Sequence, residues 1–237
     1  MLLAILLSLN AQSPAADYLQ RAHLTASTDT LDTFTSEAGG AIGAGHGAYI
    51  IRSAHPSIGA HWEIVDTWYD STGRETARQS VRTAARGFMT ELETVRATTD
   101  SASLLITPDH VTAWVVPAGS APLLYDGAVS GDRYPPVVVA SAIARTHARS
   151  GTTFRYQAYT LFGGSPLQTR LDSIRIVRRD TLHRGEKRLA VVVLQRSNGG
   201  EIWVDEATGT ELLSRGRAGP GRCWWHIRRG ITPPRER

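Results

Sequence analysis

The chain has 237 residues, of which 41% are hydrophobic and 20% are charged. This length fits one large β domain or two small ones, and the even spread of apolar residues excludes a low-complexity, disordered chain. Cys223 is the single cysteine, which excludes an intramolecular disulfide and an all-cysteine metal site.

The formal net charge of +4 is unevenly distributed along the chain. Residues 1–144 contain 8 arginines and 14 acidic residues, a balance of −6, whereas residues 145–237 contain 18 basic and 8 acidic residues, a balance of +10. A basic half attracts an acidic envelope protein or an anionic membrane surface. The alternative interpretation is that these arginines form the solvated face of amphipathic strands. We expect no nucleic acid partner.

An apolar run opens the chain at Leu2–Leu9. Its eight residues are too few to cross a bilayer, which needs about 20. Followed by small residues at 13–15, it is typical of a signal peptide, which we assign to residues 1–16. The mature protein is then periplasmic or otherwise exported, soluble and not lipid-anchored. No basic residue precedes the run, so an upstream start codon and a buried first strand remain alternatives.

Short alternating segments separated by turn residues follow residue 60. One such turn is Asp70-Ser-Thr-Gly73, where Asp caps the turn and Gly accepts a positive φ. This spacing predicts a β meander and argues against βαβ units, which need long helical crossovers. The predicted strands of this part are His61–Asp70, Glu75–Thr83, Phe88–Ala97, Leu104–Thr107 and Val111–Val116.

The alternation breaks once, at Pro135–His147. Prolines are tolerated at a helix start, and apolar residues at 138, 139, 142 and 143 form one helical stripe. We therefore predict a helix that packs on the sheet.

Strands resume after the helix. The segment Leu189–Arg196 is almost continuously apolar, as expected for a central strand covered on both faces. The predicted strands are Thr153–Phe162, Leu167–Arg179, Leu189–Arg196, Glu201–Asp205, Glu211–Ser214 and Arg222–Arg229. The fold class is thus mainly β, a single antiparallel curved sheet (half-barrel) packed on one or two helices. It occupies residues 17–217, and residues 218–237 supply a closing strand and a basic tail.

The motifs of common catalytic sites are missing. Gly127-Ala-Val-Ser-Gly131 places its first glycine one residue too far from the serine for a hydrolase elbow. Asp66-Thr67-Trp68 lacks the glycine of an aspartic-protease site, and we expect Asp66 and Asp70 to flank a hairpin. The eight histidines include no metal-binding pair on a helix, and Gly39–Gly47 lacks a phosphate-binding pattern. We therefore expect no catalysis, no cofactor and no metal.

Aromatic residues are the remaining candidates for a binding site. On a curved sheet, one face of such side chains lines an apolar pocket, whereas the simpler interpretation for any single one of them is that it fills the core. The candidate ligand-binding residues are Trp62, Trp68, Trp114, Tyr156, Tyr159 and Trp203.

One segment carries a family resemblance. Ile202-Trp203-Val204-Asp205-x-x-Thr208-Gly209 resembles the strand–turn–strand of the LolA/LolB-like periplasmic lipoprotein-carrier superfamily and of related exported β half-barrel domains of unknown function. The resemblance implies a half-barrel around a helix, with an apolar concavity for acyl chains and no catalytic residue. From strand geometry, Asp205 begins a turn. The basic C-terminal half and its tryptophan-rich tail depart from the carrier.

These observations favour an exported protein that binds a lipid or other hydrophobic small molecule in a half-barrel cavity. The alternative is an envelope protein-interaction module that uses the basic C-terminal half. A hydrolase with a scattered active site is a third hypothesis.

Overall fold

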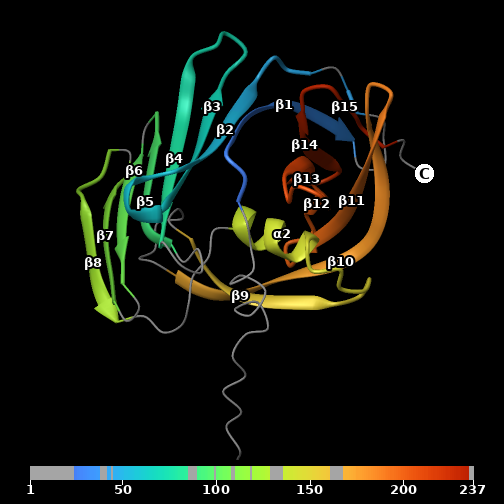
Figure 1. Ribbon diagram of the computed structural model, residues 1–237. Coiled ribbons are helices and arrows are strands. Elements are labelled where there is room, and N and C mark those ends of the chain that lie inside the picture. Colours follow the sequence, from blue (N-terminus) through green and yellow to red (C-terminus); the bar gives the residue numbers. More distant parts are fainter. Residues whose placement is uncertain are drawn as a thin grey trace, which may run out of the picture.

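A computed structural model describes residues 24–37, 42–43, 45–84, 90–98, 100–107, 110–117, 119–128, 136–160 and 168–234. At residues 60, 136, 157–160 and 168–171 it describes the backbone alone. The strands form one open, curved, antiparallel sheet around a central helix (Figure 1).

The N-terminal half of the sheet is a meander in which each strand pairs with the next. Its strands are β1 (Ser27–Glu37), β2 (Tyr49–Pro56), β3 (Trp62–Tyr69), β4 (Glu75–Thr83), β5 (Thr90–Ala97), β6 (Ser101–Ile106), β7 (His110–Val116) and β8 (Leu123–Ala128). A short 3-10 turn, η1 (Ile58–Ala60), connects β2 to β3.

The C-terminal half begins with the helix and continues as a second meander. Its elements are α2 (Pro136–Ala144), β9 (Thr153–Thr160), β10 (Gln168–Arg184), β11 (Lys187–Arg196), β12 (Glu201–Asp205), β13 (Glu211–Gly219), β14 (Arg222–Arg228) and β15 (Ile231–Thr232). Both β9 and β15 pair with β10.

The two halves join where β1 lies between β14 and β2. Phe34 faces Trp225 across one pair, and Leu31 faces Ile50 across the other. The first and last parts of the chain are therefore neighbours in one sheet. The prediction of a single curved antiparallel sheet packed on a helix is confirmed.

The inner face of the sheet, which curves toward α2, carries the larger core. Apart from Ser141 the helix is apolar, and its residues 138–144 are at most 4% exposed. An amphipathic helix needs a solvated side, whereas this one is enclosed. It packs against Phe154, Tyr156, Val192 and Val204, among other inner-face residues.

The outer face carries a second core, because strand β10 changes sides. The pairing of β10 with β11 shifts between Ile176 and Arg178, which is a β-bulge. A bulge inserts one extra residue into a strand. Even-numbered residues before the bulge therefore point to one face of the sheet, and even-numbered residues after it point to the other. Ile176 therefore faces α2, whereas Leu182 joins the outer cluster with Val191, Val193, Trp203, Leu212, Leu213, Trp225, Ile227 and Ile231.

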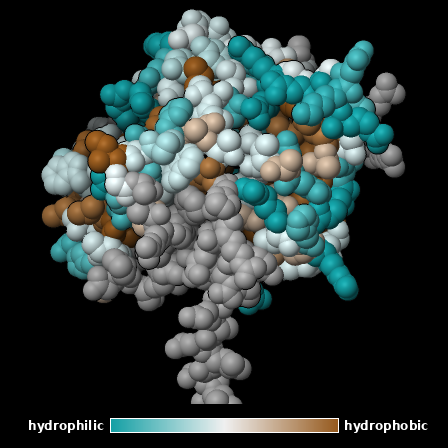
Figure 2. Space-filling model, viewed as in Figure 1, coloured by the Kyte–Doolittle hydropathy of each residue, from teal (hydrophilic) through white to brown (hydrophobic). Residues whose placement is uncertain are grey.

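The surface differs between the two ends of the sheet. Hydrophobic side chains gather over β7 and β8, and hydrophilic ones project at the upper right of the same view (Figure 2). The exposed hydrophobic residues at the first end are Leu105, Trp114, Leu123 and Leu124, each of which is 48–65% exposed. Strand β8 ends the sheet, so this patch reaches its edge.

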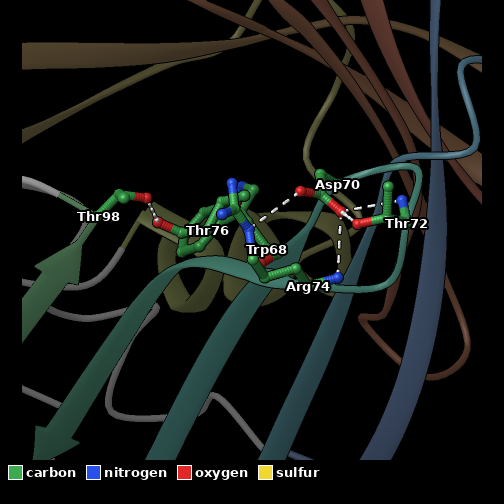
Figure 3. A network of polar contacts seen from close by, with 6 residues as sticks. All are labelled: Trp68, Asp70, Thr72, Arg74, Thr76 and Thr98. Atoms are coloured by element: carbon green, nitrogen blue, oxygen red, sulfur yellow. Dashed lines mark hydrogen bonds and ion pairs between the residues drawn. The ribbon is translucent and has the colours of Figure 1, made fainter.

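Several local predictions agree with the structure. The turn after β3 is built as expected: Asp70 Oδ1 accepts hydrogen bonds from the backbone N–H groups of Thr72 and Arg74 at 2.9 and 3.1 Å (Figure 3). The bond from the Thr72 hydroxyl is the main reason that the pKa of Asp70 is lowered. The apolar run in β11 is buried on both faces.

Other features differ from the predictions. Strands β1, β2 and β8 were missed, and β10 continues to Arg184 instead of ending at Arg179. Asp66 does not flank a hairpin but lies inside β3. The predicted signal peptide, residues 1–16, lies outside the described residues. Among the helices described, none is long and apolar enough to cross a membrane.

Candidate functional site

A large concavity lies on the outer face, between β10, β12, β13, β14 and the segment after β15. Its volume is about 1100 Å³. A typical pocket for a small organic ligand has about 300–1,000 Å³, so this one is large enough for a chain-like molecule. It is lined by Arg178, Arg179, Asp180, Thr181, Leu182, His183, Glu201, Trp203, Arg215, Trp225, Thr232, Pro233 and Pro234. We call it the outer cavity.

Two tryptophans form the floor of the outer cavity, each beneath an arginine. The ring centroids of Trp203 and Trp225 are 6.2 Å apart. The guanidinium carbon of Arg178 lies 5.7 Å from the Trp203 ring, and that of Arg215 lies 5.1 Å from the Trp225 ring. Both are cation–π contacts, which hold the guanidinium groups over an apolar surface.

A carboxylate lies between these arginines. Glu201 Oε2 accepts a hydrogen bond from Arg215 Nη2 at 2.7 Å, and its Oε1 is 3.8 Å from Arg178 Nη1. Arg178 also forms an ion pair with Asp180 at 3.5 Å. Glu201 and Arg215 face each other across β12 and β13, so the strand register fixes this pair.

The two indole N–H groups of the floor differ in their hydrogen bonding. Trp225 Nε1 donates to Ser36 Oγ of β1 at 2.9 Å. Trp203 Nε1 is buried and finds no acceptor among the described residues. An unpaired buried donor costs about 1–3 kcal/mol, so the Trp203 N–H is a local cost in this core.

The wall opposite the strands comes from the C-terminal segment. Strand β15 is two residues long and pairs with β10 through His183–Thr232 and Arg184–Ile231. Ile231 is 7% exposed and packs into the outer core, which anchors the segment. Pro233 and Pro234 then continue along the cavity.

A second group of charges lies on the inner face. Arg52 makes two hydrogen bonds to Asp66, at 2.7 and 2.8 Å, and a third to Glu211 at 2.7 Å. We call these three residues the inner network. It joins β2, β3 and β13, and so connects the two halves of the sheet. Beside it is a cavity of only about 50 Å³, which is too small for an organic ligand.

Burial and charge act in opposite directions on the inner network. Burial of Glu211 would raise its pKa, but Arg52, Arg196 and hydrogen bonds from Ser214 and Arg52 lower that pKa to about 2. The pKa of His226 is lowered, mainly by burial. The network therefore favours the ionised form of Glu211 and the neutral form of His226, and the cavity beside it is too small for an organic substrate.

The six aromatics predicted as ligand contacts are not brought together. Trp62 and Trp68 are half-buried on β3, and Trp114 is 50% exposed on β7. Tyr156 is 2% exposed in the inner core and donates to Asp172 Oδ2 at 3.3 Å. The side chain of Tyr159 is outside those that the structure describes. Among the described members of the set, Trp203 alone lines the outer cavity.

The sequence reasoning missed Trp225, Arg178, Arg215 and Glu201 as site residues. A signal existed for Trp225, since the alternation of Arg222–Arg229 in the sequence puts Cys223, Trp225 and Ile227 on one face of a strand. The others required knowledge of the β10 bulge and of the strand register.

The segment that carried the family resemblance forms a turn against the helix. Asp205 Oδ1 accepts a hydrogen bond from the Ala207 N–H at 2.8 Å, so Asp205 forms a turn as expected. Gly209 has a φ of +72°, and a Cβ at this position would collide with the Ser141 side chain of α2. This turn is thus part of the inner core and not of the outer cavity.

Neither a group of metal ligands among the described residues nor a match to a known protein points to a further site. Within the part of the chain that the structure describes, no three His, Cys, Asp or Glu side chains are grouped to hold a metal ion. Comparisons with models of protein families, with curated proteins and with solved structures give no match.

Proposed function

We propose that this is an exported protein that binds a lipid or other hydrophobic ligand without catalysis, and that the ligand occupies the outer cavity. The observation that carries the proposal is the pair of tryptophans beneath a cavity of about 1100 Å³. Export is supported by the apolar run at the N-terminus.

The division of space between the two faces supports this location. On the inner face, α2 packs against the sheet, and the cavity beside the inner network is about 50 Å³. The outer cavity has both apolar and polar walls, as ligand sites that bury a hydrophobic body and orient a polar end do. The resemblance to the lipoprotein carriers agrees in ligand chemistry, although those carriers are expected to bind on the inner side.

The test compares ligand content and binding in two variants. Pro233→Trp places a bulky side chain in the wall of the outer cavity, and Pro56→Trp makes the same change at an exposed position of β2. Native mass spectrometry with lipid extraction, and titration with a neutral fluorescent hydrophobic probe, should show a bound ligand in the unchanged protein and in Pro56→Trp. Pro233→Trp should bind the probe at least ten-fold more weakly.

The outcome that overturns the proposal is equally specific. A purified protein that carries no lipid and binds no hydrophobic probe is not a hydrophobic ligand carrier. If the probe binds the unchanged protein and both variants equally, its binding site is not the outer cavity.

A second candidate function is an interaction with an acidic envelope protein or an anionic membrane surface. It is favoured by exposed basic residues at the hairpin of β10 and β11: Arg175, Arg184, Lys187 and Arg188. This function predicts salt-sensitive binding to an acidic polypeptide or to vesicles of anionic lipid, unchanged by Pro233→Trp.

A further inference from the structure

The outer cavity has the features of a site for an anionic amphiphile. Resting on the proposed function, we infer that its ligand carries an oxyanion, a carboxylate, phosphate or sulfate, attached to an apolar chain. The oxyanion binds to Arg178 and Arg215, where the Glu201 carboxylate now lies, and the chain covers the tryptophan floor.

The loose pairing of Arg178 is the first support. Arg178 lines the cavity beside two carboxylates, Asp180 and Glu201. Its ion pairs with them, at 3.5 and 3.8 Å, are both longer than a charge-assisted hydrogen bond. Its guanidinium is therefore able to take a closer oxyanion from a ligand.

The position of Glu201 is the second support. Its side chain is 11% exposed, and its two oxygens face two different guanidinium groups. An oxyanion with the size of a carboxylate therefore fits between the arginines. A ligand that brings its own oxyanion competes with Glu201 for the same donors.

The cation–π contacts explain why the arginines suit this role. A guanidinium that stacks on an indole keeps its N–H groups at its edge, where they donate in the plane to an oxyanion. Arg178 stacks on Trp203 and Arg215 stacks on Trp225, so both donors are held at the boundary between an apolar floor and the open cavity.

The floor of the cavity adds a third support. Trp203 and Trp225 lie side by side, with ring centroids 6.2 Å apart, and both line the cavity beside the two arginines. An apolar chain attached to the oxyanion therefore has an aromatic surface to cover.

Three probes separate this inference from the function on which it rests. Isothermal titration at fixed ionic strength compares dodecanoate, methyl dodecanoate and acetate. We expect dodecanoate to bind at least ten-fold more tightly than its neutral ester, and acetate not to displace it at equal concentration.

Each other outcome has one meaning. If neither amphiphile binds, the proposed function fails. If the acid and the ester bind equally, that function stands and the anionic class is wrong. If acetate displaces dodecanoate at equal concentration, the site takes a small free anion and the amphiphile inference is overturned.

Three variants test the residues. Arg178→Gln should reduce dodecanoate affinity at least five-fold and leave the ester unchanged, whereas Glu201→Gln should increase dodecanoate affinity because it removes the internal competitor. Arg188→Gln, an exposed arginine that does not line the cavity, is the control. Unchanged urea midpoints confirm folding. A Glu201→Gln variant that folds normally and binds dodecanoate more weakly contradicts the inference.

Discussion

Two arginine–carboxylate groups lie on opposite faces of the same sheet and differ in how tightly their charges are paired and how far they are buried. In the inner network, Arg52 makes three hydrogen bonds of 2.7–2.8 Å to two carboxylates. In the outer cavity, Glu201 is 2.7 Å from Arg215 but 3.8 Å from Arg178. The Arg52 side chain is 19% exposed, whereas that of Arg178 is 44% exposed.

The difference separates a structural role from a binding role. A buried charge must keep its partners, since removing one of them leaves the other uncompensated. A partly exposed ion pair costs little to break, so its members are able to exchange partners with a ligand. The inner network thus stabilises the junction of the two halves, whereas the arginines and carboxylates of the outer cavity are able to bind a ligand.

The largest expected effect is the loss of Arg52. Arg52→Met leaves Asp66 and Glu211 buried without their cation, and should lower the free energy of unfolding by about 3–5 kcal/mol. Arg178→Gln, the matched change in the outer cavity, should lower it by less than about 1 kcal/mol. Urea unfolding followed by tryptophan fluorescence measures both. Equal losses in the two variants would remove the distinction between the faces.

Acid should act through the inner network. The pKa of Glu211 is lowered from 4.5 to about 2 in the folded protein, so the stability from this residue is fully present above about pH 4.5. It is lost as the pH falls toward 2, because the unfolded chain takes up the proton first, and the loss amounts to roughly 3 kcal/mol. Urea midpoints between pH 5 and pH 2 measure it. In Glu211→Gln this part of the acid dependence should be missing; an unchanged slope would contradict the assignment.

The turn that packs on the helix gives a smaller effect. Gly209→Ala introduces a Cβ at a φ of +72° and against Ser141, and should cost about 2–3 kcal/mol. Gly185→Ala has a φ of +59° with open space around it, and should cost about 1 kcal/mol. The difference in thermal or urea midpoints reports the contact between turn and helix. Similar costs would mean that backbone strain alone explains both.

The smallest expected effect is at Trp114. This residue is 50% exposed on the outer face of β7, at the end of the sheet away from the outer cavity. Trp114→Ser should change stability by no more than about 0.5 kcal/mol and leave dodecanoate affinity unchanged. A loss of affinity in Trp114→Ser would move the binding site to the β7–β8 patch.

The fold was predictable where local signals were strong. Strand β4, Glu75–Thr83, matches its predicted bounds, and its turn residues Asp70 and Gly73 behave as expected. Strand β1 was missed because it is polar: Asp29 and Asp32 pair with Arg228 and Arg229 of the C-terminal part instead of alternating with apolar residues. Such pairing is invisible before the sheet is assembled.

The site was less predictable than the fold. Trp203 was identified, but its neighbour Trp225 is 22 positions later in the chain and reaches it through β13. Arg178 enters the cavity because the bulge after Ile176 reverses its side, and no residue type in β10 marks that bulge. Tyr156, like Trp203, is an aromatic residue in a predicted strand, yet it fills the inner core.

The indole N–H signals offer the most direct test of the central claim. A ¹H–¹⁵N spectrum resolves the six tryptophans, and Trp203→Phe and Trp225→Phe assign the two signals of the floor. On addition of dodecanoate, the Trp203 and Trp225 signals should both shift, because the chain covers the two rings that form the floor of the outer cavity. Bound dodecanoate with an unchanged Trp203 signal would contradict the account.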